Sequence, residues 1–100
     1  KYGYTPLHLA VRFNELEIVK VLHEAGSKVN SIDNYKDTPL LDSTRNKFTD
    51  MSEFLICKGA YRNVSDAHDM TPLHYASKTS DLHIANMLRS ESVESYCQKR

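Results

Sequence analysis

The chain of 100 residues has no tryptophan, two cysteines, three glycines and three prolines. Two cysteines are too few for a disulfide framework or a cysteine-based metal cluster. Its 13 basic and 13 acidic residues leave no formal net charge, so the charge does not indicate a nucleic acid or an anionic membrane as a partner. No apolar run approaches the roughly 18 residues of a membrane-spanning helix. With 100 residues, the chain is long enough for a single small domain but too short for a large core.

The two cysteines and the first residue lead to further expectations. We expect Cys57 and Cys97 to be unpaired, with Cys57 as a buried free thiol. Free thiols favour reducing surroundings and a cytoplasmic location, although composition does not name the compartment. The chain begins at Lys1, without an initiating methionine or a signal peptide, and we therefore expect it to be a segment of a longer protein.

One short pattern recurs at a constant interval and organises the chain. Thr-Pro-Leu begins at Thr5, again at Thr38 and again at Thr71, which is a period of 33 residues. A threonine hydroxyl caps the first turn of a helix, and proline suits the first helical position because no intrahelical donor is missed there. A constant period of this size is typical of stacked repeats. The pattern therefore predicts three helices that begin in the same way.

Each unit continues with a second apolar stripe. The residues of this stripe lie thirteen and seventeen positions after each threonine: Ile18 and Leu22, Met51 and Leu55, and Ile84 and Leu88. Members of each pair are four residues apart and so share one face of a helix. In the first unit we expect one helix over residues 6–13 and a second over residues 16–25. Gly26 and Gly59 then occupy the left-handed position that ends a helix.

The middle unit has the least favourable residues. Lys36 stands where the first unit has Gly3, and a left-handed backbone at this position would cost a lysine on the order of 1 kcal/mol. Ser52 also replaces the apolar Val19 in the second stripe. We therefore expect the middle unit to be the least stable of the three.

The first unit closely resembles an ankyrin repeat. The resemblance rests on Gly-Tyr-Thr-Pro-Leu-His-Leu-Ala at residues 3–10, Leu-Glu-Ile-Val at residues 16–19 and Ala-Gly at residues 25–26. It covers about residues 1–90 and implies an all-α solenoid, in which stacked helix–turn–helix units are joined by β-hairpin-like loops. The repeats would span approximately residues 1–33, 34–66 and 67–92, with a polar tail over residues 93–100. Ankyrin repeats act almost entirely by binding other proteins.

The resemblance also implies where a partner would bind. In ankyrin-like arrays the hairpin tips and the exposed side of each first helix line a concave face. The corresponding residues are Tyr2, Tyr4, Arg12 and Phe13 in the first unit, Asn34, Tyr35, Asp37, Arg45 and Asn46 in the second, and Ala67, His68, Met70, Lys78 and Thr79 in the third. Tyrosine and arginine often dominate binding energy.

Catalytic and metal sites find little support in the residue patterns. The chain contains no paired Cys-x-x-Cys, His-x-x-x-His, glycine-rich phosphate loop or nucleophile elbow. His8 and His74 match the structural histidine of ankyrin repeats, and His68 is the one histidine expected to touch a partner. We therefore expect no catalytic residue, no metal, no cofactor, no small-molecule substrate, no nucleic acid and no membrane.

The sequence thus predicts a non-catalytic module that binds a protein or peptide. Two alternatives remain open. The same face could instead occlude the active site of an enzyme, which would make the chain an inhibitory module. The chain could also be a structural spacer within a larger scaffold.

Overall fold

The computed structural model describes residues 3–97, which fold into seven α-helices. The helices are α1 (Pro6–Arg12), α2 (Leu16–Glu24), α3 (Pro39–Arg45), α4 (Thr49–Cys57), α5 (Pro72–Lys78), α6 (Leu82–Arg89) and α7 (Glu94–Cys97). The described residues contain no strand. None of these helices is long and apolar enough to cross a membrane.

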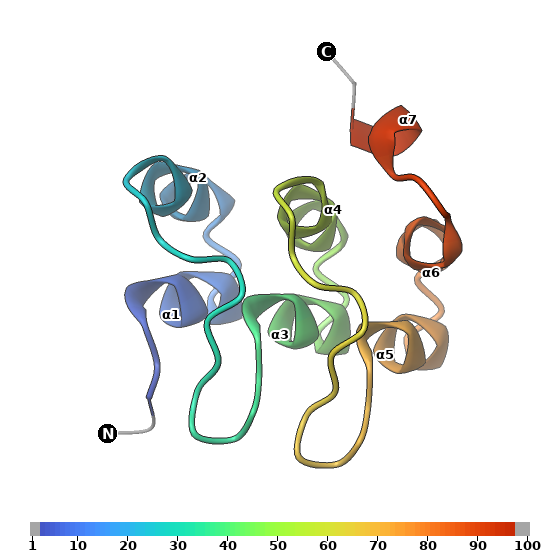
Figure 1. The fold of residues 1–100 in the computed structure, drawn as a ribbon, viewed down its shortest axis with the longest axis horizontal. Coiled ribbons are helices and arrows are strands. Elements are labelled where there is room, and N and C mark those ends of the chain that lie inside the picture. Colours follow the sequence, from blue (N-terminus) through green and yellow to red (C-terminus); the bar gives the residue numbers. More distant parts are fainter. Residues whose placement is uncertain (1–2, 98–100) are drawn as a thin grey trace.

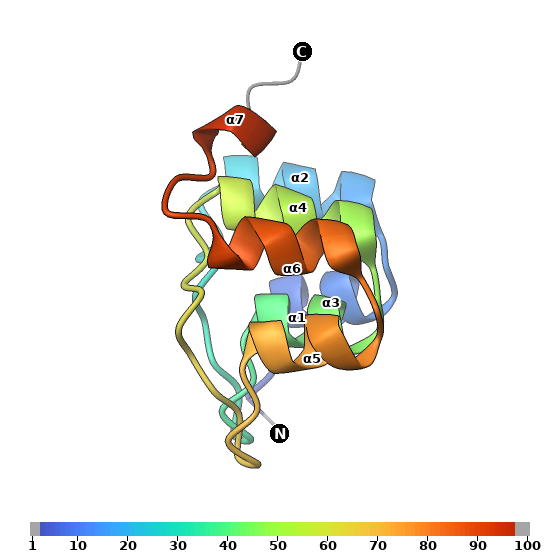
Figure 2. The same cartoon turned by 90° about the vertical axis from the view of Figure 1, so that its right-hand side faces the viewer.

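The first six helices form three antiparallel pairs that stand side by side in a row. Figure 1 shows α1, α3 and α5 in one layer and α2, α4 and α6 in a second layer. The loops between α2 and α3 and between α4 and α5 project beyond the first layer, as Figure 2 shows from the end of the row. The predicted all-α ankyrin solenoid is confirmed, with hairpin-like loops that contain no strand.

Each first helix begins with the predicted threonine cap. The hydroxyl oxygens of Thr5, Thr38 and Thr71 each accept a hydrogen bond at 3.2 Å from the backbone amide three residues later. In the outer repeats the residue three positions after the threonine is a histidine, and its Nδ1 accepts a second hydrogen bond from the backbone amide of that threonine. The distance is 3.1 Å for His8 and 2.9 Å for His74. Leu41 occupies this position in the middle repeat, and its side chain cannot accept a hydrogen bond from the amide of Thr38. The proline that follows each threonine is the first helical residue.

One aspartate closes each hairpin loop. Oδ1 of Asp33 accepts the backbone amides of Tyr35 and Asp37 at 2.8 and 3.0 Å. Asp66 does the same for His68 and Met70 at 2.8 and 3.1 Å. Such local bonds to the backbone hold an irregular loop in one conformation. The two hairpins therefore present their tips in the same way.

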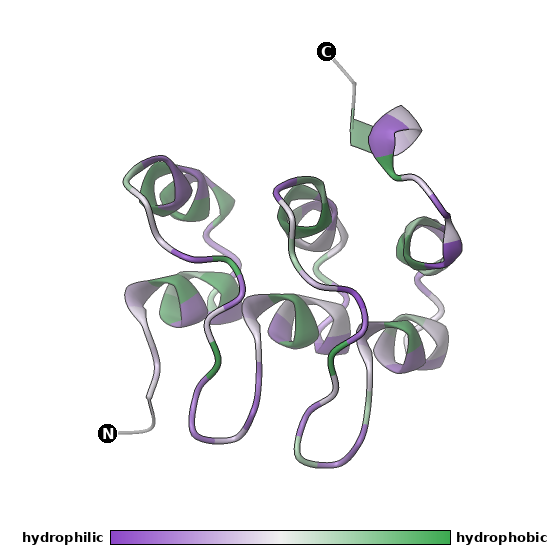
Figure 3. Ribbon diagram, viewed as in Figure 1, coloured by the Kyte–Doolittle hydropathy of each residue, from purple (hydrophilic) through white to green (hydrophobic). Residues whose placement is uncertain are grey.

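The two layers are joined by one apolar core. Hydrophobic residues, green in Figure 3, occur along the helices of both layers. Leu7 and Leu40, the leucines of the first two Thr-Pro-Leu patterns, are fully buried. Ile18 differs from its expectation because it is 50% exposed, whereas its counterparts Met51 and Ile84 are fully buried. Those counterparts lie beside a preceding helix pair, while α2 stands at the end of the described row.

Hydrogen bonds satisfy the polar stripe of the middle repeat. The hydroxyls of Ser43 and Ser52 lie 2.7 Å apart in the core, and Ser43 also donates to the carbonyl oxygen of Leu40 at 3.0 Å. Thr44 donates to the same carbonyl at 2.9 Å. These bonds offset the cost of burying three hydroxyl groups. The lower stability expected for this repeat stays a prediction.

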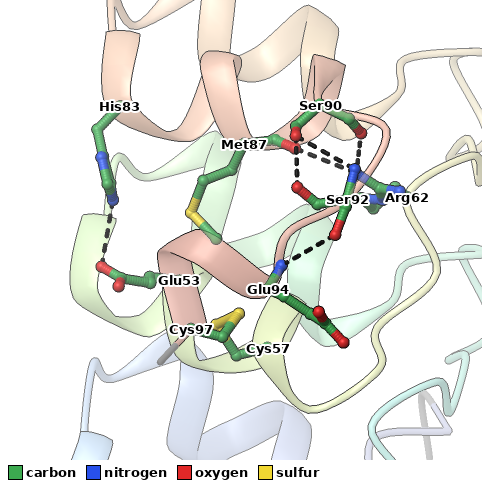
Figure 4. The surroundings of a disulfide bond; sticks show 9 residues. All are labelled: Glu53, Cys57, Arg62, His83, Met87, Ser90, Ser92, Glu94 and Cys97. Carbon is green, nitrogen blue, oxygen red and sulfur yellow. Dashed lines mark hydrogen bonds and ion pairs between the residues drawn. A yellow bond between two sulfur atoms is a disulfide. The ribbon is translucent and has the colours of Figure 1, made fainter. Parts of the chain in front are cut away.

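The expectation of a free Cys57 was wrong. Cys57 at the end of α4 is disulfide-bonded to Cys97 in α7, with their Cα atoms 5.5 Å apart (Figure 4). The pairing arises because α7 folds back onto α4, and Tyr96 and Val93 pack against the core beside it. A separation of 40 residues gives no sign of this contact in the sequence. The expectation of reducing surroundings loses its support with the free thiol.

The chain adopts a left-handed backbone at Lys36, where φ is +66°. This conformation costs a residue with a side chain about 1–2 kcal/mol. Glycine avoids that cost but loses more conformational entropy on folding, which lowers stability by about 0.5–1 kcal/mol. We therefore predict that Lys36→Gly raises the free energy of unfolding by roughly 0.5–1 kcal/mol in urea denaturation. Lys28→Gly is the matched control, since Lys28 is exposed without a positive φ, and it should lower the stability instead. Equal effects of the two substitutions would contradict the prediction.

The disulfide closes a long loop and restricts the unfolded chain. We predict that Cys97→Ser lowers the free energy of unfolding by about 2–4 kcal/mol without reductant, measured in urea. Dithiothreitol should lower the stability of the original chain by a similar amount and leave the Cys97→Ser variant unchanged. An original chain that is insensitive to dithiothreitol would show that the bond contributes nothing.

Candidate functional site

The hairpin loops and the first layer of helices enclose a hollow of about 240 Å³. It lies where the two hairpin tips meet α3 and α5. Its walls are formed by Tyr35, Asp37, Arg45, Asp66, Ala67, His68 and Tyr75. Tyr35 and His68 are exposed on the hairpins, whereas Asp66 and Tyr75 are buried. The hollow thus has a buried polar floor and an accessible aromatic rim.

Arg45 is the centre of the polar floor. Its Nη1 lies 2.7 Å from Oδ1 of Asp42, and its Nη2 lies 2.8 Å from Oδ1 of Asp37 and 3.2 Å from Oδ2 of Asp66. Burial would lower the pKa of the guanidinium, but hydrogen bonds with Asp37 and Tyr75 and the charges of Asp37 and Asp42 outweigh burial and raise it above the ordinary value. The side chain therefore stays charged and is held in place from three directions.

Asp66 links the second hairpin to both neighbouring helices. Its Oδ2 accepts bonds from Arg45 and from the hydroxyl of Tyr75. Burial would raise the pKa of this carboxyl, but the bonds from Tyr75, two backbone amides and Arg45 outweigh burial and lower it to about 2. Burial and the bond to Asp66 raise the pKa of Tyr75. At neutral pH an ionised Asp66 thus faces a protonated Tyr75.

The equivalent cluster between the first two repeats is less complete. Arg12 lies 3.9 Å from Asp33 and 3.6 Å from Asp42, distances too long for hydrogen bonds. Nε of Arg12 and Oδ2 of both aspartates are buried without a hydrogen bond to a described residue. Burial raises the pKa of Asp42, although Arg12 opposes this shift. The position of Asp42 corresponds to that of Tyr75, one repeat later.

The structure brings five of the predicted binding residues together. Tyr35, Asp37, Arg45 and His68 all line the hollow, and so does Ala67. The other predicted residues do not line it. Tyr4 lies under the guanidinium of Arg12, with the two groups 4.4 Å apart, and Met70 is half-buried.

The remaining predicted residues fall mainly at helix ends. Phe13, Asn46 and Thr79 are the C-caps of α1, α3 and α5, and Phe13 is 73% exposed. Asn34 and Lys78 are exposed, and Tyr2 lies outside the described residues. Whether these residues touch a partner stays a prediction.

Sequence reasoning missed Asp66, Tyr75 and Asp42 as parts of this site. Asp66 matches Asp33 one repeat earlier, and the sequence indicates for both only bonds to the local backbone. Tyr75 aligns with Leu9 and Asp42, so its column shows no consistent chemistry. The spacing of Asp66 and Tyr75, nine residues apart across a hairpin and a helix turn, gives no sign of their bond.

A second hollow, of about 380 Å³, lies between α2 and α4 beside the disulfide. Its walls include Leu16, Phe54 and Tyr96, together with two lysines and two acidic residues. His83 on α6 lies 3.2 Å from Glu53 on α4 nearby (Figure 4). Among residues 3–97 no three His, Cys, Asp or Glu side chains are grouped as metal ligands would be.

The chain belongs to the ankyrin-repeat family. A family model described as ankyrin repeats in three copies matches residues 7–99. Proteins built from such repeats are in general protein–protein interaction modules, and the fold is typically non-catalytic.

Three relatives illustrate the range of proteins that contain similar segments. The chain is 34% identical over 88 residues to the probable 26S proteasome regulatory subunit p28 of Saccharomyces cerevisiae, an alignment that covers 86% of the chain and 39% of p28. It is 42% identical over 59 residues to the BRCA1-associated RING domain protein 1 of Caenorhabditis elegans, covering 58% of the chain and 8% of that protein. It is 32% identical over 76 residues to the putative ankyrin repeat protein FPV230 of fowlpox virus, covering 76% and 40%. The chain therefore spans two fifths or less of the length of these relatives.

The lowered pKa of Asp66 predicts a pH dependence of stability. Between about pH 4 and pH 2 the unfolded chain binds a proton at Asp66, whose ordinary pKa is 3.8, before the folded chain does. The stability that Asp66 contributes is therefore complete above pH 4 and is lost as the pH falls through 2. We predict that Asp66→Asn flattens this part of the curve of unfolding free energy against pH, measured by urea denaturation. Asp50→Asn is the matched control, because Asp50 is exposed on α4, and it should keep the original slope.

Proposed function

We propose that the chain is a non-catalytic module that binds a protein or peptide partner on the concave face formed by the hairpin tips and the first helices. The observation that carries this proposal is the hollow between the two hairpins and helices α3 and α5. It combines a recess with the accessible side chains of Tyr35 and His68. Tyrosine at the rim of a recess is typical of residues that dominate binding energy.

The preorganised floor of the hollow supports the proposal. Asp33 and Asp66 hold the hairpins through backbone amides, and Arg45 joins both hairpins to α3. A surface that is already ordered loses little conformational entropy when a partner binds. The same bonds use the charged groups of the floor for structure, which favours recognition over catalysis.

The length of the relatives supports a role within a larger protein. Each of these three relatives is more than twice as long as the segment that the chain matches. Two of them are named as a probable proteasome regulatory subunit and a BRCA1-associated RING domain protein, so both names refer to association with other proteins. We propose that this chain likewise provides a docking surface for a partner of the protein that contains it.

Selection of peptides from a random twelve-residue display library tests the proposed function. We predict that selected peptides bind the original chain and that Tyr35→Ala weakens them about tenfold, because Tyr35 supplies exposed aromatic area at the rim. Tyr61→Ala is the matched control, since Tyr61 is also exposed but does not line the hollow. Equal losses for the two variants would place binding elsewhere, and a library without enriched peptides would favour the spacer.

An inhibitory module would use the same face and differ in what it does to its partner. It would bind one enzyme in a one-to-one complex and abolish that enzyme's activity. Activity assays on a partner captured through the face containing Tyr35 separate this alternative from a docking surface, because docking leaves the partner active.

A further inference from the structure

We infer that the hollow between the hairpins accepts a basic side chain, lysine or arginine, from an extended segment of the partner. The inference deepens the proposed function and rests on it. The geometry that supports it is the placement of Asp37 and Asp66 in the wall of a recess whose rim carries Tyr35.

The polar floor around the hollow carries an excess of negative charge. Its acidic members are Asp33, Asp37, Asp42 and Asp66, and its basic members are Arg12 and Arg45. Four carboxylates therefore share two guanidinium groups within one connected network. A recess with low-dielectric walls concentrates the resulting negative potential and attracts a cation.

Asp37 is the carboxylate best placed to bind that cation. Its side chain is only 10% exposed, and its Oδ1 accepts the bond from Arg45. No described residue donates a hydrogen bond to its Oδ2. A nearly buried carboxylate that lines a recess and has one unused oxygen can form a short, charge-assisted bond with an incoming ammonium or guanidinium.

An anionic group is the less suitable occupant, although Arg45 also lines the hollow. Both terminal nitrogens of Arg45 already bond to carboxylates, Nη1 to Asp42 and Nη2 to Asp37 and Asp66. An anion would have to displace one of these aspartates and leave it buried without its partner, which is costly. A cation requires no such rearrangement, and the rings of the tyrosines in the wall provide further favourable contact with it.

Titration of the full chain with short synthetic peptides, followed by backbone-amide NMR, tests this inference. The probes are acetylated and amidated Gly-Ser-X-Ser-Gly peptides in which X is arginine, lysine, citrulline or glutamate. We expect the arginine or lysine peptide to shift the amide signals of residues 34–37 and 66–69, with an affinity that falls as salt rises. The citrulline and glutamate peptides should bind about tenfold more weakly, because they lack the positive charge.

Two substitutions at one position change the charge at the hollow in opposite directions without touching its buried bonds. Ala67 is exposed and lines the hollow, so Ala67→Lys should place a cation there and abolish binding of the arginine peptide. Ala67→Glu adds a negative charge at the same position and should tighten that binding. Asp37→Asn should weaken it about tenfold, while the control Asp50→Asn leaves it unchanged.

The possible outcomes separate this inference from the proposed function. If library-selected peptides bind at Tyr35 but the arginine and citrulline probes bind equally well, the basic side chain is excluded and the docking surface stands. Signal shifts confined to α2 and α4 would exclude both the basic side chain in the hollow and the docking surface at the hairpins. Identical effects of Ala67→Lys and Ala67→Glu would also overturn the inference, because a size effect would then explain the loss.

Discussion

The carboxylate at the base of each hairpin loop is the interaction on which the rest of this structure depends. Asp66 binds two amides of its own loop through one oxygen, and through the other it binds Arg45 on α3 and Tyr75 on α5. One side chain thus sets the shape of the hairpin and joins it to two consecutive helix pairs. Without that carboxylate the tip would lose both its conformation and its place over the first layer. The recess exists because the tip is held there.

The two interfaces between repeats bury equivalent polar clusters, but one of the clusters is hydrogen-bonded more completely than the other. Between the second and third repeats, Tyr75 reaches Asp66 and completes the network around Arg45. Between the first and second repeats, the equivalent position holds Asp42, and the guanidinium of Arg12 stays beyond hydrogen-bond distance. A carboxylate in place of a phenol shortens the side chain and adds a charge, so buried polar atoms remain without a bond. The accessible recess with ordered walls forms at the better satisfied interface.

The disulfide holds a short C-terminal helix against α4 in the second layer, a contact that the repeat pattern does not provide. Helix α7 has four residues and would not be stable alone in water. It is held by the bond between Cys57 and Cys97 and by the packing of Val93 and Tyr96. Arg62 from the second loop also donates to the carbonyl oxygens of Met87 and Ser90, which end α6 (Figure 4). The last helix pair is thereby joined to the loop and the helix that precede it.

The sequence by itself determined the first six helices and their order, because those depend on local chemistry that repeats every 33 residues. A Thr-Pro pair starts the first helix of each repeat, and Asp33 closes a loop through amides only two and four residues away. Only the tertiary structure decided the site and the disulfide. Asp66, Tyr75 and Arg45 meet across two helices and a loop, and Cys57 meets Cys97 because α7 turns back. Such contacts join residues whose separation follows no period, so no local pattern in the chain could indicate them.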